Sequence, residues 1–416
     1  MSASIADLKS KFRDPSAAEL ELIARYAMLP EDGRRARAFD AFAMTGLPHR
    51  RMEAWKWSDF RAAVHEISAS QRRYECEPLP ATGAVEIVFS EGRVDLPGSV
   101  PAGLKLHIRD TAQALGDAEA IPLGAMTASM SRRIGGLDSL VLEVNAPVET
   151  PVHIVCKGER DETNFARVHV VVREKASLDL IESHVGGAGF SSFLLEADLA
   201  REGQLTRTLL QRGAADEAQA VTALVKLDED ARFTQTVLAF GAKLSRIETR
   251  VNHQGTGSEA RLNAAYMCAR GFHADLTSHV RHGAPSCVTR QVTKGAVLDG
   301  GTGVFQGKFL VPRHIGQYTD ADMQHQALLL EEGASVFAKP ELEIYADDVE
   351  CAHGNTSGAL DANQLFYMRQ RGIPEAQARA LLTEAFIAEA LEDASEVVSA
   401  ALVDAARSWL GQGNSA

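Results

Sequence analysis

The feature that most constrains the fold is a long succession of short segments in which apolar and polar residues alternate, from about residue 80 to about residue 350. Examples are residues 167–173, 177–181, 232–238, 261–267 and 335–338. A period of two is typical of half-buried β-strands, and Gly, Asn, Asp and Pro separate the segments as turn residues do. No long amphipathic helix interrupts this region, which excludes a fold of alternating strands and helices. The sequence therefore predicts a mainly β protein.

The turns between these segments recur at loose intervals. Short turns containing Ala or Gly precede several predicted strands, at residues 174–176, 202–203, 230–231, 257–258 and 332–334. A spacing of roughly 25 residues is typical of a solenoid, in which one structural unit is stacked on its neighbour. A parallel β-helix fits this pattern. A large β-sandwich is the alternative, and the periodicity alone favours neither.

Helical patterns flank the strand region on both sides. Near the N-terminus, Ser16 and Glu19 form a predicted capping box ahead of an apolar helical stripe. After the strand region, Asp361 is a predicted N-cap and Gly372 the predicted end of a short helix. We therefore expect a helical region at residues 1–78, a strand core at residues 79–358 and a second helical region at residues 359–416.

Charge and composition narrow the function classes. The 416 residues carry a net charge of −13, which argues against nucleic acid or an anionic membrane surface as the main partner. We find no apolar run of about 18 residues that would suggest a membrane span, and no secretory signal. The cysteines are scattered, as expected for reduced thiols in the cytoplasm rather than a disulfide framework. They are Cys76, Cys156, Cys268, Cys287 and Cys351.

Cys351 and His353 are the strongest candidate ligands for a metal. They are two residues apart, and in an extended chain such residues point to the same side, with Cα atoms roughly 7 Å apart. A thiolate and an imidazole are half of a tetrahedral site. A remote segment of the chain or another protein could complete the site, or the pair could have only a structural role. The alternation fails near Asp347, so the preceding strand is expected to bend or end there.

Three histidines, His273, His279 and His282, gather in one predicted strand. In an extended chain His273 and His279 share a face and His282 points to the other. They could bind a metal, but hydrogen-bonded histidines in a strand or an interface are the favoured interpretation. Two glycine-rich segments, residues 255–260 and 301–308, lack the helix or the hydroxyl that a nucleotide site requires. The sequence therefore predicts no nucleotidase in this chain.

Several ordered motifs resemble one known family. Residues 340–349, Cys351 to Gly354, and residues 365–373 and 378–386 resemble the C-terminal signature of the SufB/SufD family of iron–sulfur cluster assembly proteins. Leu47, Pro48, Glu53, Trp55 and Lys56 resemble an N-terminal element of the same family. The glycine at position 354 resembles the SufD branch of the family, because SufB-type chains have an acidic residue at this position.

The resemblance implies a fold and a role. It favours a right-handed parallel β-helix for the core at 79–358, flanked by the two helical regions. It implies a non-catalytic scaffold subunit that pairs with SufB along the β-helices and binds the ATPase SufC, which hydrolyses the ATP. His353 would donate a ligand at the SufB–SufD interface, and Cys351 would ligate or position it. The C-terminal helical region would dock SufC, with Phe366, Leu381, Leu382 and Phe386 as candidate contacts.

The cofactor expectations follow from the same resemblance. No cofactor is expected to bind stably to the chain alone; a nascent iron–sulfur cluster or iron would be shared with SufB, and flavin would bind only in the complex. The isolated chain could form a homodimer. A SufB-like primary cluster scaffold is one alternative function. A β-helix polysaccharide hydrolase or lyase that uses Asp320 and Asp322 is another, although no Trp lies between Trp57 and Trp409 to stack on a sugar.

Overall fold

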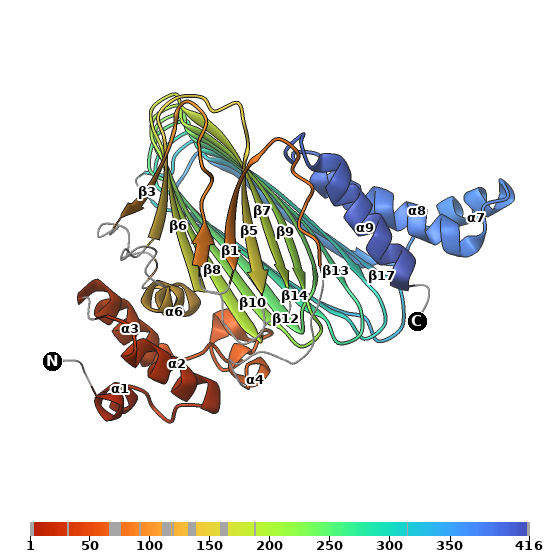
Figure 1. Ribbon diagram of the computed structural model, residues 1–416. Coiled ribbons are helices and arrows are strands. Elements are labelled where there is room, and N and C mark those ends of the chain that lie inside the picture. The colour runs from red at the N-terminus through yellow and green to blue at the C-terminus, as the bar shows by residue number, and fades with distance from the viewer. Residues whose placement is uncertain are drawn as a thin grey trace.

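The computed structural model describes most of the chain and consists of a strand core with helices at both ends (Figure 1). The described residues are 4–30, 33–65, 76–90, 93–109, 118, 120–131, 139–158, 165–186, 189–313 and 315–413.

Two long sheets form the core. The ten-stranded sheet has the order β19-β17-β15-β13-β11-β9-β7-β5-β1-β2, and the nine-stranded sheet has the order β18-β16-β14-β12-β10-β8-β6-β4-β3. The first contains β1 (Val85–Ser90), β2 (Arg93–Asp95), β5 (Val152–Gly158), β7 (Ser177–Gly186), β9 (Gln204–Gly213), β11 (Arg232–Gly241), β13 (Glu259–Cys268), β15 (Val288–Val297), β17 (Asp320–Leu329) and β19 (Glu350–Gly358). The second contains β3 (Leu104–Arg109), β4 (Ser139–Val144), β6 (Phe165–Val172), β8 (Phe190–Leu199), β10 (Ala218–Leu227), β12 (Leu244–His253), β14 (His273–His282), β16 (Thr302–Val311) and β18 (Ser335–Ile344).

The connectivity is that of a parallel β-helix. From β5 onward the chain alternates between the two sheets, and each strand up to β17 pairs in parallel with the strand one coil before and one coil after it. Val237 of β11, for example, lies between Leu209 of β9 and Ala264 of β13. The predicted parallel β-helix flanked by helices is therefore confirmed. The β-sandwich alternative is wrong, because strands from successive coils pair in parallel within each sheet.

Alternate side chains of both sheets fill the interior of the solenoid. Leu205, Phe233 and Ala260 lie in one row of the ten-stranded sheet, and Val225 and Val251 come from the opposite sheet.

Stacked turns join the two sheets. In one of them the Gly257 backbone has a φ of +72°, and an added Cβ would lie 2.4 Å from Oδ1 of Asp230 in the coil before. Only glycine fits that turn without strain.

The N-terminal helices cover the outer face of the nine-stranded sheet. They are α1 (Ile5–Ser10), α2 (Ala17–Ala27), α3 (Gly33–Thr45), the 3-10 helix η1 (Glu53–Trp55), α4 (Phe60–Ala63) and α6 (Pro122–Met130). The predicted capping box of Ser16 and Glu19 is present at the start of α2. The apolar residues of these helices form one cluster with Phe190, Ala218 and Leu244 of the sheet.

Helix α6 was not expected from the sequence. It lies within the strand region, and its residues from Leu123 to Met130 are all buried. A helix that is buried on every side has no amphipathic pattern, so the periodicity of its residues gives no helical signal.

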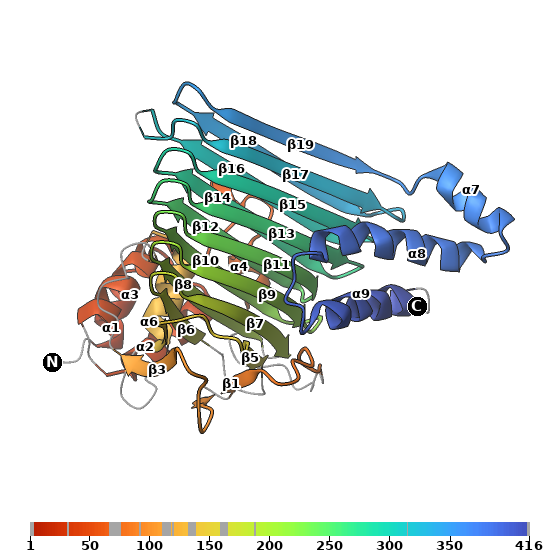
Figure 2. The same ribbon diagram turned by 90° about the horizontal axis from the view of Figure 1, so that it is seen from above.

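The C-terminal helices cover the outer face of the ten-stranded sheet (Figure 2). They are α7 (Ala362–Gln370), α8 (Glu375–Ala388), the 3-10 helix η2 (Glu389–Leu391) and α9 (Ser399–Gly413). Leu391 and Leu402 pack in one cluster with Ile181, Leu210 and Leu238 of the sheet. Within the described residues, no helix is long and apolar enough to cross a membrane.

Candidate functional site

The C-terminal end of the solenoid has two open strand edges. Strand β18 ends one sheet and β19 ends the other, and each pairs with a strand on one side only in the part of the chain that the structure describes. Both strands lie at the same end of the molecule (Figure 2). An unpaired edge offers a row of backbone N–H and C=O groups to another strand. This end of the solenoid is therefore suited to β-strand pairing with a partner.

A tight turn separates the two edge strands. Strand β18 ends at Ile344 and β19 starts at Glu350, which confirms the expected end of the strand near Asp347. Asp348 has a φ of 56°, and its carbonyl accepts a hydrogen bond of 2.8 Å from the backbone N–H of Tyr318 in the turn one coil before. The turn is thus held against the preceding coil, so the start of β19 is fixed in register.

Cys351 and His353 share one face of β19, as predicted. Cys351 pairs with Ala321 and His353 with Met323, and both of these β17 residues are buried on the inner face of the sheet. Cys351 is half-buried and packs against the core, whereas His353 is exposed at the open end. The imidazole is therefore the more accessible of the two candidate ligands.

The Cys351 thiol is held in its protonated form. Burial raises its pKa above the usual value, and the carboxylate of Asp320 raises it further. A metal would have to displace the proton before the sulfur could ligate. Among the described residues, no three His, Cys, Asp or Glu side chains are grouped so that they could hold a metal ion. The two candidates are a half-site within these residues.

Two of the three histidines of β14 have hydrogen-bond partners. His273 Nε2 lies 3.2 Å from the Ser58 hydroxyl, and His282 Nε2 lies 2.9 Å from the Thr289 hydroxyl. His282 is buried, and its ring stacks on that of His253 with centroids 5.0 Å apart. The preferred interpretation as hydrogen-bonded strand histidines is confirmed for these two. The predicted division of the three between opposite faces also agrees with their alternation along β14.

Comparisons with known proteins match the strand core and the first C-terminal helices. Residues 154–386, from β5 to α8, match the family described as SUF system FeS cluster assembly, SufBD core domain. The chain belongs to the SufBD family. Its members take part in iron–sulfur cluster assembly, so the resemblance carried by residues 340–386 is confirmed at the level of the family.

Curated relatives in this family extend the match over most of the chain. It is 31% identical over 378 residues to the iron–sulfur cluster assembly protein SufD of Escherichia coli strain K12, with 84% of this chain and 85% of the relative covered. It is 28% identical over 419 residues to an iron–sulfur cluster assembly SufBD family protein of Synechocystis, with 90% and 91% covered. The SufD of Bacillus subtilis is 24% identical over 280 residues, with 64% and 62% covered.

Asp320 and Asp322, the carboxylates that a polysaccharide hydrolase or lyase would use, have structural partners in the strand core. Asp320 forms an ion pair with Arg290, and Asp322 accepts a hydrogen bond of 2.9 Å from Nε2 of Gln324. The Gln324 side chain crosses over Gly354, where an added Cβ would lie 2.4 Å from its Oε1. A side chain at position 354 would therefore have to displace Gln324.

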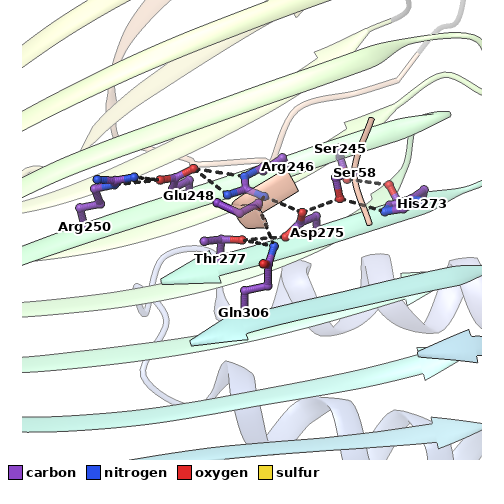
Figure 3. Close-up of polar contacts among 10 residues, drawn as sticks. Ser58, Ser245, Arg246, Glu248, Arg250, His273, Asp275, Thr277 and Gln306 are labelled. Carbon is purple, nitrogen blue, oxygen red and sulfur yellow. Dashed lines mark hydrogen bonds and ion pairs between the residues drawn. The ribbon is translucent and has the colours of Figure 1, made fainter. Parts of the chain in front are cut away.

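The N-terminal Trp element contacts strands β12 and β18 of the nine-stranded sheet. The buried Arg246 guanidinium forms ion pairs of 2.8 Å with Asp275 and 3.0 Å with Glu248 (Figure 3). It also lies 3.7 Å from the centroid of the Trp55 ring and donates a hydrogen bond to the Ala54 carbonyl. Two further contacts reach the edge strand. The rings of Trp57 and Phe337 stack with centroids 5.7 Å apart, and Lys339 Nζ lies 2.9 Å from Oε1 of Glu53. Trp55 and Trp57 are thus packing anchors, as expected: Trp55 contacts β12 and Trp57 contacts β18.

Helix α7 has no buried side chain. The N-cap role of Asp361 is confirmed by its bond of 2.7 Å from the backbone N–H of Asn363. Phe366 and Tyr367 are 62% and 59% exposed, and Figure 2 shows α7 extending away from the sheets. Leu381 is also exposed, whereas Leu382 and Phe386 in α8 are half-buried. Tyr367 was not singled out from the sequence, because α7 has no apolar stripe.

Proposed function

We propose that the chain is a scaffold subunit of the SUF iron–sulfur cluster assembly complex, which pairs with SufB and with the ATPase SufC and donates His353 as a ligand at the SufB interface. The observation that carries this proposal is the position of His353. It is exposed on the edge strand β19, beside only one other candidate ligand, Cys351. A ligand set that is incomplete within the described residues and lies at an open strand edge can be completed by a partner that pairs with that edge.

The pairing itself would use both sheets. Strands β18 and β19 end their sheets side by side, so a partner with a similar solenoid end could continue both ladders at once. Such a contact would bury the exposed Ile344 and the half-buried Leu342 along with the backbone edges. Burial of apolar surface and completion of backbone hydrogen bonds both favour that association.

The ligand chemistry suits a transient cargo. Imidazole and thiolate both bind ferrous iron and iron–sulfur clusters, and both lose metal affinity when they are protonated. Because the pKa of Cys351 is raised by burial and by Asp320, its sulfur is the weaker ligand until a metal displaces the proton. We therefore assign direct ligation to His353 and a positioning or secondary ligand role to Cys351. Iron or a nascent cluster is cargo here, and flavin would enter only with the assembled complex.

The C-terminal helices would form the SufC contact. Phe366 in α7 and Leu381 in α8 are exposed, and Leu382 and Phe386 continue the surface at partial exposure. Exposed aromatic residues on a helix without buried side chains fit a groove on a partner protein. ATP hydrolysis would reside in SufC, so the chain is proposed to have no catalytic activity of its own and to work in the cytoplasm.

The test is the His353→Ala variant of the full chain, expressed with SufB and SufC. The exposed ring makes no large packing contribution, so the free energy of unfolding should change by less than about 1 kcal/mol. The complex should assemble and hydrolyse ATP, but maturation of a client iron–sulfur protein should fall by more than tenfold. Thr356→Ala, on the opposite face of the same strand, is the matched control and should behave as the wild type.

Three outcomes decide between the alternatives. Normal client maturation by His353→Ala would refute the ligand role. Failure of that variant to assemble would make His353 an interface residue and would leave a role as a metal ligand without support. A stable cluster formed by the wild-type chain alone with iron and sulfide would instead favour a SufB-like primary scaffold.

A further inference from the structure

A cavity on the outer face of the nine-stranded sheet is separate from Cys351 and His353, which lie in the other sheet. Its volume is about 280 Å³. Strands β10, β12, β14 and β16 form its floor, and Ala120, two residues before α6, forms part of its rim. None of its lining residues has a role in the site described above.

Two adjacent rows of side chains line this cavity. Parallel pairing aligns the residues of four neighbouring strands, so each row contains one residue from each strand. The first row is Leu224, Arg250, His279 and Lys308, and the second is Lys226, Asn252, Arg281 and Leu310. Because neighbouring strands are about 4.8 Å apart, four basic side chains are held within a small area.

The cavity is basic in a chain whose net charge is −13. Three of the four basic groups have partners: Arg250 lies 2.8 Å from Glu248, Lys308 lies 2.6 Å from Glu343, and Lys226 also has an interaction within the protein. Glu248 is shared with the buried Arg246, so it neutralises Arg250 only in part. The Arg281 side chain is exposed, and among the described residues it forms no ion pair or hydrogen bond. Its guanidinium is the free cation at the mouth of the cavity.

The N-terminus of α6 adds positive potential at the same rim. Its N-cap residue is Ile121, whose side chain provides no cap, and no acidic residue lies in the first turn. Ile121 packs in one apolar cluster with Leu224, which lines the cavity floor. The positive end of the helix dipole therefore lies beside the basic rows, and such ends stabilise anions.

The floor of the cavity is not uniformly polar. Leu224 and Leu310 provide apolar surface beside the basic groups. His279 contributes a neutral imidazole, because burial lowers its pKa to about 4. Inorganic phosphate could contact the basic groups but would leave the half-buried Leu310 uncovered. An anion with an organic body would cover both kinds of surface.

We propose that this cavity binds a small organic phosphate, with the phosphate group on Arg281 and the N-terminal end of α6 and the organic body on the apolar part of the lining around Leu310. The planar guanidinium can donate two parallel hydrogen bonds to phosphate oxygens, which a lysine cannot do. This site does not depend on cluster assembly and would be present in the isolated full-length chain.

The test is isothermal titration of the full-length chain with adenosine monophosphate, adenosine and inorganic phosphate as separate probes. Adenosine monophosphate should bind with a dissociation constant below about 1 mM, adenosine should not bind measurably, and inorganic phosphate should bind at least tenfold more weakly. Arg281→Gln should weaken binding of adenosine monophosphate by about tenfold or more, as expected for the loss of charge-assisted hydrogen bonds. Arg201→Gln, an equivalent charge change at an exposed turn, is the matched control.

Three results would overturn the proposal. One is no measurable binding of adenosine monophosphate. Another is equal affinity for inorganic phosphate, which would indicate an adventitious ion only. The third is an equal loss of affinity in Arg201→Gln and Arg281→Gln, which would indicate nonspecific charge attraction. Unchanged thermal unfolding of Arg281→Gln would establish that any loss of binding is not a loss of fold.

Discussion

His325 and Asn355 are hydrogen-bonded across the last two strands of the ten-stranded sheet, with Nδ1 of His325 2.6 Å from Oδ1 of Asn355. Because the amide oxygen can only accept, Nδ1 carries the proton. Burial lowers the pKa of His325, so the ring is neutral and its Nε2 accepts from the Tyr266 hydroxyl at 3.0 Å. The ring also stacks on Phe305 with centroids 4.7 Å apart. The edge strand β19 is thus tied to the interior of the solenoid.

The first prediction concerns this tie. In Asn355→Leu, the buried Nδ1–H of His325 loses its acceptor, and an unsatisfied buried donor costs about 1–3 kcal/mol. We expect the free energy of unfolding in urea to fall by this amount. Backbone amides of residues 350–358 should also exchange with deuterium faster than in the wild type, because the edge strand is held less firmly.

The matched control for the first prediction is Thr356→Leu. Thr356 is the next residue on β19, is exposed and lies on the opposite face. Its substitution should change the free energy of unfolding by no more than about 0.5 kcal/mol. Equal stability of Asn355→Leu and the wild type would show that the hydrogen bond does not restrain β19.

The second prediction concerns the buried Arg246. Burial disfavours the Glu248 carboxylate, but Arg246 and Arg250 outweigh that effect and hold its pKa at about 2. Arg246→Met would leave Asp275 buried without its cation, and such a loss typically costs about 3–5 kcal/mol. It would also remove the support under Trp55, so we expect a red shift of tryptophan fluorescence together with the loss of stability.

Arg232→Met is the control for this second prediction. Arg232 is exposed and lies 3.9 Å from Glu259, also exposed at the surface. Surface ion pairs contribute about 0–1 kcal/mol, so this variant should unfold almost as the wild type does. A similar small effect of Arg246→Met would mean that the Trp element does not depend on the buried ion pairs.

The sequence predicted the fold class because the information for strands is local. The alternation in residues 232–238, for example, suffices to place a strand there. The choice between β-helix and sandwich is not local, since it depends on whether β11 pairs with β9 and β13 in parallel. Alternation is the same in both architectures, and only the family resemblance distinguished them. Helix α6 was missed because burial on all sides removes the period of an amphipathic helix.

The candidate site, too, could be predicted from the sequence only where it depends on spacing within one strand. A period of two places Cys351 and His353 on one face, and the register confirms it. The bond from His325 to Asn355 and the approach of Gln324 to Gly354 join neighbouring coils. Such contacts depend on which residues the pairing of β17 and β19 brings together, so no spacing within one strand could reveal them.

The third prediction concerns stability at acidic pH. His153 is buried with its Nε2 2.9 Å from the Ser183 hydroxyl, and burial lowers its pKa to about 4. An unfolded histidine has a pKa of about 6.5, so His153 contributes stability above that pH, and this is lost as the pH falls toward 4. Between pH 7 and pH 5 the loss is about 2 kcal/mol for this group.

His153→Gln tests the acid prediction directly. Urea denaturation between pH 4.5 and pH 6 should give a stability curve that is shallower by about 1.2 kcal/mol per pH unit, because nearly one proton fewer is taken up on unfolding. Ser183→Ala is the control, because it keeps the histidine and should keep the slope. An unchanged slope in His153→Gln would mean that His153 does not titrate between the folded and unfolded states.

The last prediction separates the proposed docking of SufC from folding of the core. Deleting all residues after Leu360 would not do so, because Leu391 and Leu402 cover Ile181 and Leu238 on the outer face of the sheet. The double variant Phe366→Ser and Tyr367→Ser changes only exposed side chains, so the free energy of unfolding should stay within about 1 kcal/mol of the wild type. Binding of SufC, measured by titration, should weaken at least tenfold, because exposed aromatic anchors dominate such contacts. Tyr318→Ser, at an equally exposed tyrosine in a turn, should bind SufC normally. Wild-type affinity of the double variant would remove α7 from the interface.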